Sequence, residues 1–177
     1  DRGDLIRKIK IPRWIIVLSS SFSALINLGL NLIVVFIFMM VNDANFLRTA
    51  LWLPVILIEV YIFALGLSLF LSAAYVKYRD VRYIWEVVLQ GLFYLTPILY
   101  PLSFVTNKTV QKIILVSPLG QAIQDARYVV VSHKTTTPHQ LFDGGWYVYV
   151  PYAVAAVVLL IGVLYFRRES KYFAENI

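Results

Sequence analysis

Residues 14–42 read WIIVLSSSFSALINLGLNLIVVFIFMMVN and contain no charged side chain over 29 positions. A helix that crosses a bilayer needs about 20 mostly apolar residues, so this stretch predicts a membrane-spanning helix. The rest of the chain agrees, since 60% of its 177 residues are hydrophobic and only 15% are charged. The sequence therefore predicts an all-α integral membrane protein rather than a soluble domain.

Three further stretches are long and apolar enough to cross a bilayer. Residues 49–76 contain one charged side chain, Glu59, whereas residues 87–107 and 144–166 contain none. We treat the whole chain, residues 1–177, as a single transmembrane domain. We predict four transmembrane helices, at residues 15–41, 50–76, 84–104 and 146–166.

The segment between the last two predicted spans, residues 105–145, is mixed in character. Its middle reads VQKIILVSPLGQAIQDARYVVV, two moderately apolar pieces that are joined at Ser117-Pro118 and are too short to span. Because a helix commonly ends before a proline, we expect two short interfacial or re-entrant helices here. Residues 132–145, SHKTTTPHQLFDGG, are typical of an exposed loop.

The distribution of lysine and arginine predicts the orientation, because cytoplasmic flanks of membrane spans are enriched in both. If the first span runs outward, eleven of the 16 basic side chains lie on the inner side and five on the outer side. We therefore expect residues 1–14 and 167–177 to be cytoplasmic and residues 105–145 to be external.

Several motifs of catalysis and cofactor binding are missing from the sequence. No glycine precedes a lysine, which excludes a phosphate-binding P-loop, and no GxSxG or HExxH motif occurs. The chain has no cysteine, and its two histidines lack acidic neighbours at ligand spacing. We expect no catalytic residue, no metal site and no cofactor in this chain, and no nucleic-acid partner. If the protein does work on a substrate, we expect the energy to come from another chain.

Glu59 is an ionisable residue inside a predicted span. Such a residue is costly at membrane depth and usually faces the interior of a helix bundle, where it marks a functional site. It lies about ten residues after Arg48, a rise of only about 15 Å in a helix, so it can sit close to the outer interface. We favour a structural hydrogen-bonding role over a functional site.

Two basic stretches have alternative interpretations. Residues 4–14, DLIRKIKIPRW, fit either a basic flank that contacts lipid phosphates or a short cytoplasmic element that contacts a partner. Residues 75–83, YVKYRDVRY, fit a stop-transfer flank with interfacial tyrosines, although Asp80 is not required by that interpretation.

Four segments together resemble the permease subunits of bacterial ABC exporters for polysaccharides and polyol phosphates. The strongest likeness is the loop Tyr78-Arg79-Asp80 followed about fifteen residues later by LTPILYP. That family exports O-antigens, capsular polysaccharides and teichoic acids. The four segments are LIRKIKIPR (5–13), AYVKYRDVRYIWEVVLQGLFYLTPILYPLSFV (74–105), SPLGQAI (117–123) and FRRESKYFAENI (166–177).

The resemblance implies a role for the N-terminal segment. Permeases of that family have six spans and a cytoplasmic coupling helix between the second and the third. By this likeness the chain would lack the first two spans and the N-terminal helix. The residues implied to couple to the ATPase are Leu5, Ile6, Arg7, Lys8, Ile9, Pro12 and Arg13.

The resemblance also implies an assembly of two permease copies with two ATP-binding subunits that hold ATP and Mg. The substrate would be a lipid-linked glycan moving through a channel lined partly by aromatic rings, which offer flat apolar faces to sugars. A helix broken by prolines is tolerated where it lines a cavity, although a kinked helix end with interfacial tyrosines is the simpler alternative. The implied channel residues are Tyr94, Thr96, Pro97, Tyr100 and Pro101.

Taken together, the sequence and the resemblance predict a permease of lipid-linked polysaccharide or teichoic acid in the bacterial cytoplasmic membrane. An exporter of drugs or lipids from the same superfamily is an alternative. A membrane enzyme of envelope glycan assembly is a third possibility, but it would be expected to carry clusters of charged catalytic residues in its outer loop. Residues 105–146 offer only Asp125, Arg127, Asp143 and the two histidines.

Overall fold

The computed structural model describes residues 13–41, 48–133, 135–142 and 144–170, and the regular elements among them are helices. Within these described residues, three helices are long and apolar enough to cross a membrane. They are α2 (Arg13–Val41), α3 (Leu53–Lys77), which follows the short helix η1 (Arg48–Trp52), and α8 (Val150–Glu169), which follows η3 (Trp146–Tyr149). These helices confirm the all-helical, multi-pass membrane architecture and coincide with three of the four predicted spans.

The predicted span at residues 84–104 is helical over only part of its length. Its helix, α4 (Val81–Leu95), has 15 residues and rises about 22 Å, less than the ~30 Å of a bilayer core. The chain then turns before a short helix η2 (Leu102–Phe104). Pro97 explains the early end, because proline has no backbone N–H and disfavours helix at the residue before it.

Three short helices follow α4 and η2. They are α5 (Lys108–Val116), α6 (Pro118–Val130) and α7 (Pro138–Leu141). The first two meet at Ser117-Pro118, which confirms the predicted break. At the start of α5, the Asn107 side chain accepts a hydrogen bond from the backbone N–H of Thr109 at 2.9 Å. α7 interrupts the loop predicted at residues 132–145, and its capping box between Thr137 and Gln140 explains why four residues suffice there.

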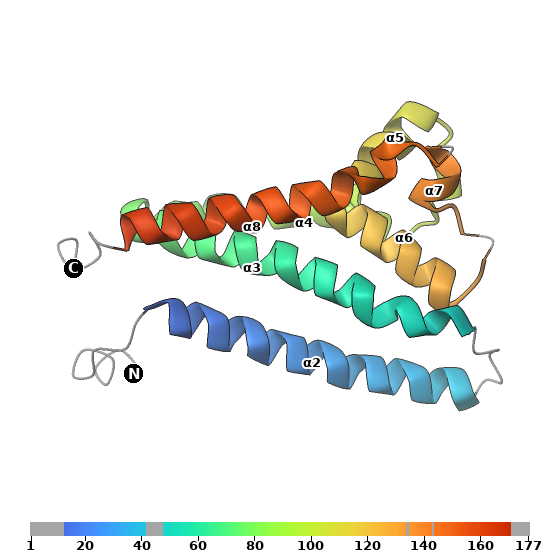
Figure 1. The fold of residues 1–177 in the computed structure, drawn as a ribbon, viewed down its shortest axis with the longest axis horizontal. Helices are drawn as coiled ribbons and strands as arrows, with labels where there is room; N and C mark the ends of the chain where they lie inside the picture. The colour runs from blue at the N-terminus through green and yellow to red at the C-terminus, as the bar shows by residue number, and fades with distance from the viewer. Residues whose placement is uncertain (1–12, 42–47, 134, 143, 171–177) are drawn as a thin grey trace.

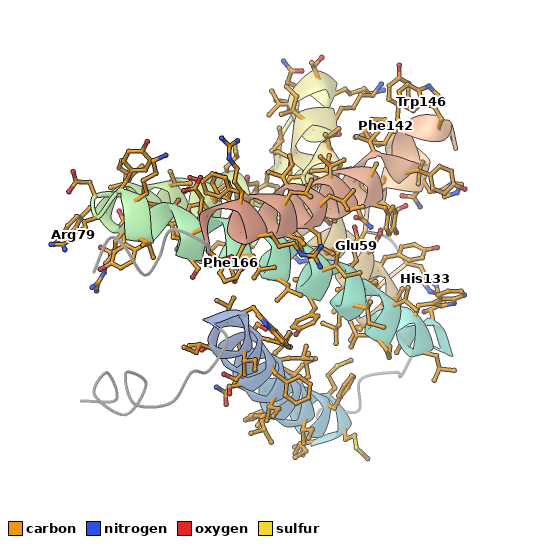
Figure 2. The ribbon with its side chains drawn as sticks, turned by 60° about the vertical axis from the view of Figure 1, so that its left-hand side comes forward. Glu59, Arg79, His133, Phe142, Trp146 and Phe166 are labelled. Carbon is orange, nitrogen blue, oxygen red and sulfur yellow. The ribbon has the colours of Figure 1, made fainter. Side chains whose placement is uncertain are left out.

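α3 and α8 pack directly against each other at a pair of glycines. A Cβ atom at Gly66 would lie 2.6 Å from the Cα atom of Leu159, and one at Gly162 would collide with the Gly66 carbonyl oxygen. Two small residues therefore let the two backbones touch, as in many membrane helix pairs. Farther along the pair, Ala73 of α3 and Phe166 of α8 form a buried apolar cluster, and Figure 2 shows Phe166 on this part of α8.

α2 packs much more loosely. No described side chain of α2 is buried. A mostly apolar cavity of about 500 Å³ separates part of α2 from α3 and α8, lined by Trp14, Leu69 and Phe166 among others. Ser21 of α2 and Tyr61 of α3 share a side-chain hydrogen bond at 3.2 Å.

The helices have two distinct ends (Figure 1). The start of α2, the end of α8 and the connection from α3 to α4 lie at one end, and α5, α6 and α7 gather at the other. We call the second the cap end, formed by residues 96–146. The described basic residues at the first end are Lys77, Arg79, Arg82, Arg167 and Arg168. This arrangement agrees with the predicted grouping of the basic flanks.

Candidate functional site

The end of α4 and the turn after it, residues 96–101, form what we call the outer turn. The backbone N–H of Thr96 makes the last hydrogen bond of the helix, to the Leu92 carbonyl oxygen at 2.8 Å. Two residues later, the Ile98 N–H donates to the Thr96 carbonyl oxygen at 2.7 Å, which reverses the chain. The carbonyl groups in the last turn of α4 therefore need partners from outside the helix.

The Tyr100 hydroxyl supplies one of these partners. It donates toward the carbonyl oxygens of Leu95 at 3.1 Å and Tyr94 at 3.3 Å. The hydroxyl thus folds back onto the helix end that Pro97 interrupts. Tyr100 is consequently a structural residue of the outer turn.

Arg127 ties the outer turn to α6. Its guanidinium group donates to the carbonyl oxygens of Ile98 at 2.6 Å and Tyr100 at 3.3 Å. A pocket of about 340 Å³ lies beside these bonds, and its walls include Arg127, Thr135 and Thr136. The turn and α6 therefore form one unit at the cap end.

The five predicted channel residues do not share one surface. Tyr94 is 73% exposed on α4, and its ring packs edge-on against Phe93. Thr96 and Pro97 are buried in the turn, whereas Pro101 is exposed. Of the two tyrosines, only Tyr94 therefore presents an unobstructed ring.

Glu59 belongs to a second group of polar residues, which we call the carboxyl cluster: Glu59, Gln121, Asp125 and Tyr152. Glu59 is only 6% exposed on α3, and the Gln121 amide of α6 lies against it. The Gln121 Nε2 group donates to Asp125 Oδ2 at 2.6 Å and to the Tyr152 hydroxyl of α8 at 3.0 Å. Figure 2 shows Glu59 where α3 passes α8 and α6, far from Arg79 at the other end. The cluster joins all three helices.

The environment of Asp125 favours its neutral form. Burial raises the pKa of Asp125, while the hydrogen bond from Gln121 and the nearby His139 oppose that shift.

Sequence reasoning singled out Glu59 but missed Gln121, Asp125 and Arg127 as partners. A signal was available, because Gln121, Gln124 and Asp125 lie at i, i+3 and i+4 on one face of a helix.

The predicted cytoplasmic loop is fully accessible. Tyr78, Arg79 and Asp80 are exposed, and the Lys77 ammonium group lies 5.6 Å from the centre of the Tyr78 ring. Asp80 precedes α4, but its side chain makes no capping hydrogen bond to that helix. The predicted coupling residues from Leu5 to Pro12 lie outside the described residues, as does the Arg13 side chain. Within the described ranges, no group of three or more His, Asp or Glu residues could hold a metal ion.

Comparisons with known proteins extend this description. A family model described as ABC-2 type transporter matches residues 6–131. The O-antigen export system permease protein RfbA of Myxococcus xanthus is 25% identical over 178 residues, covering 100% of this chain and 66% of that protein. A protein with the same name from Klebsiella pneumoniae is 26% identical over 178 residues, covering 98% of this chain and 64% of that protein. The chain thus spans about two thirds of the length of these curated relatives. No solved structure matches significantly.

Proposed function

Because the chain belongs to the ABC-2 type transporter family, we propose that it is the permease part of an ATP-driven exporter of lipid-linked polysaccharide or teichoic acid. The similarity to O-antigen export permeases over nearly the whole chain carries this proposal. It favours a glycan over the alternative substrates, drugs and simple lipids. Membrane domains of this family lack catalytic sites, so the chain is a transport component rather than an enzyme.

The proposed transporter contains two further kinds of component. An ATP-binding subunit binds ATP and Mg and supplies the energy, and a second copy of the permease completes the pathway. The coupling segment from Leu5 to Arg13 docks on the ATP-binding subunit with its apolar side chains inward. The exposed loop Tyr78-Arg79-Asp80 lies at the same end as the start of α2 and is accessible to such a subunit.

In this proposal the chain crosses the bacterial cytoplasmic membrane four times, with both ends cytoplasmic. The third crossing consists of α4 together with the outer turn. α4 alone is too short to cross the bilayer, and the outer turn supplies the rest of the crossing. Backbone without helical hydrogen bonds is tolerated there because Arg127 and Tyr100 satisfy its carbonyl groups. The cap end is then external.

A pair of single cysteines tests this topology, because the chain contains no cysteine of its own. Lys108 and Arg79 are both exposed and lie at opposite ends of the molecule. A membrane-impermeant thiol reagent applied to intact cells, after removal of any outer membrane, should label Lys108→Cys and leave Arg79→Cys unlabelled. The reverse labelling would overturn the proposed orientation.

The proposed substrate contact is the exposed ring of Tyr94. A sugar that stacks on this ring loses its contact in Tyr94→Ala, and each lost contact weakens binding by about 1 kcal/mol. Tyr83 provides the matched control, because it is 68% exposed near the opposite end of α4. Glycan at the cell surface, normalised to folded permease, should fall in Tyr94→Ala and stay at the wild-type level in Tyr83→Ala.

The same assay tests the substrate class. The complete permease, expressed with its ATP-binding subunit in a strain lacking its own O-antigen export permease, should restore surface glycan. Restored export with unchanged normalised output in Tyr94→Ala would refute only the channel role of Tyr94. Export of a fluorescent drug or lipid without any surface glycan would refute the glycan proposal itself.

A further inference from the structure

The hydrogen bonds of the carboxyl cluster depend on the amide of Gln121, which is completely buried. An amide NH₂ group has two hydrogens, and both are engaged here, one by Asp125 Oδ2 at 2.6 Å and one by the Tyr152 hydroxyl at 3.0 Å. Gln121 can therefore offer its other neighbour, Glu59, only its carbonyl oxygen. That oxygen is an acceptor.

An ionised Glu59 has only two further acceptors, its carboxyl oxygens. Neither carboxyl oxygen of Glu59 has a hydrogen-bond partner among the described residues, and neither does Oε1 of Gln121. Three buried oxygens of the carboxyl cluster thus lack a partner, and an ionised carboxylate would add a charge. A buried charge without a partner is strongly unfavourable, whereas a proton removes the charge and creates a donor.

The alternative orientation of the Gln121 amide leads to the same requirement. Oxygen and nitrogen of an amide are interchangeable in position, so the group could instead turn its NH₂ toward Glu59. Its oxygen would then lie 2.6 Å from Asp125 Oδ2, a separation that needs a proton between the two oxygens. In one orientation the proton belongs on Glu59, and in the other on Asp125.

We propose that the carboxyl cluster is a proton-binding site, in which Glu59 and Asp125 share one proton through the amide of Gln121. In the orientation found here, the protonated Glu59 donates to Gln121 Oε1, and Gln121 Nε2 donates to the ionised Asp125. The bound proton thus completes a chain of hydrogen bonds from Glu59 on α3 through Gln121 to Asp125 on α6. The site does not depend on which substrate the transporter carries.

The surroundings contain few charges that could replace the proton. The titratable groups facing the cluster are Tyr152 of α8, with Tyr149 of η3 beside it, and His139 of α7, which faces Asp125. Of these, only His139 has a basic side chain, and it is exposed. Burial raises the pKa of Asp125, which agrees with a carboxyl pair that retains a proton.

The site makes the attachment of α6 sensitive to pH. The folded protein binds a proton that the unfolded chain releases above about pH 4, the ordinary range of carboxyl groups. The free energy of unfolding therefore falls as the pH rises above that range, and deprotonation leaves two negative charges side by side. Because Arg127 on the same helix holds the outer turn, release of α6 also loosens the cap end.

The test uses the purified chain in detergent at pH values from 5 to 9. Glu59→Gln keeps the shape of the side chain and supplies a permanent donor to Gln121 Oε1. We expect the melting temperature of the wild type to fall as the pH rises, and that of Glu59→Gln to lose most of this dependence. Glu86→Gln is the control, because Glu86 is exposed and pairs with Arg82 instead. Its pH dependence should match that of the wild type.

Infrared difference spectroscopy provides a direct readout. A protonated buried carboxyl group has a carbonyl stretching band that an ionised carboxylate lacks, and this band should disappear in Glu59→Gln. Absence of the band from the wild type at neutral pH would overturn the proposal. So would a melting temperature of the wild type that rises with added Na⁺ or Mg²⁺ at constant pH but not with added protons, because a metal ion would then occupy the cluster.

Discussion

α2 and α8 both run beside α3, but only α8 is packed against it closely. At the crossing of α3 and α8, Gly66 and Gly162 bring the two backbones into contact. On α2, the glycine Gly29 has no atom within 4 Å of the position of a Cβ. Two equally apolar helices of one chain therefore have different surroundings.

This difference is informative because lipid tails are as apolar as leucine. Helices in a membrane associate through close packing and hydrogen bonds rather than through removal of apolar surface from water. The α3 and α8 pair meets this condition, whereas α2 leaves large apolar side chains such as Phe22, Leu30 and Phe38 accessible. The exposed face of α2 is available to lipid or, in the proposed transporter, to a second copy of the chain.

The largest effect is expected from filling the glycine contact. Gly66→Leu would force α3 and α8 apart, since even a Cβ atom meets the backbone of Leu159 at 2.6 Å. Overpacking of this kind costs about 3 kcal/mol or more. Unfolding in a denaturing detergent should show a loss of that size, whereas Gly29→Leu should behave like the wild type. Equal stabilities of the two variants would mean that α8 is no better packed than α2.

A smaller loss is expected where α6 holds the outer turn. Arg127→Met removes the donors to the carbonyl oxygens of Ile98 and Tyr100 while keeping the bulk of the side chain. Charged hydrogen bonds contribute about 1.5–3 kcal/mol, so we expect destabilisation by about 2 kcal/mol in a chemical unfolding titration. Arg82→Met breaks an exposed ion pair instead, worth under about 1 kcal/mol. A similar loss in both variants would contradict the proposed role of Arg127.

The same contrast applies to the two tyrosines near the end of α4. Tyr100→Phe removes the hydroxyl that folds back onto Leu95, and we expect a loss of about 1 kcal/mol in stability. Tyr94→Phe should change stability little, because the Tyr94 side chain is mostly exposed. Thermal unfolding of the two purified variants measures the difference, and the opposite order would show that the outer turn does not depend on Tyr100.

The smallest effect is expected at the contact between α2 and α3. Ser21→Ala removes the side-chain hydrogen bond to Tyr61, and such bonds between membrane helices average about 0.6 kcal/mol. Ser23→Ala is the control, because its hydroxyl bonds within α2 to the Ser19 carbonyl oxygen. A double-mutant cycle with Tyr61→Phe isolates the interaction. A coupling energy near that of a core contact would show that α2 is held more firmly than its packing indicates.

Long uncharged runs and prolines could be interpreted from the sequence alone. The two charge-free stretches are helical over residues 14–41 and 146–166, because a bilayer leaves the backbone no other way to satisfy its hydrogen bonds. The break at Ser117-Pro118 follows from the missing N–H of proline. Pro97 ends α4 for the same reason, but the helix predicted at residues 84–104 ran past it. The helical stretches and the break at Ser117-Pro118 are local, so periodicity and residue type are enough to predict them.

The tertiary structure decided which residues meet. Nothing in the spacing of Glu59, Gln121 and Tyr152 along the chain reveals that three helices bring them to one point. Likewise Tyr94 and Tyr100 look equivalent in LFYLTPILYP, and only the fold directs one ring outward and the other hydroxyl back to the backbone. Residue type and local secondary structure follow from the sequence, whereas contacts between distant segments depend on how the helices pack. Apolar helices can pack in many ways, and small residues and buried polar groups select one of these arrangements.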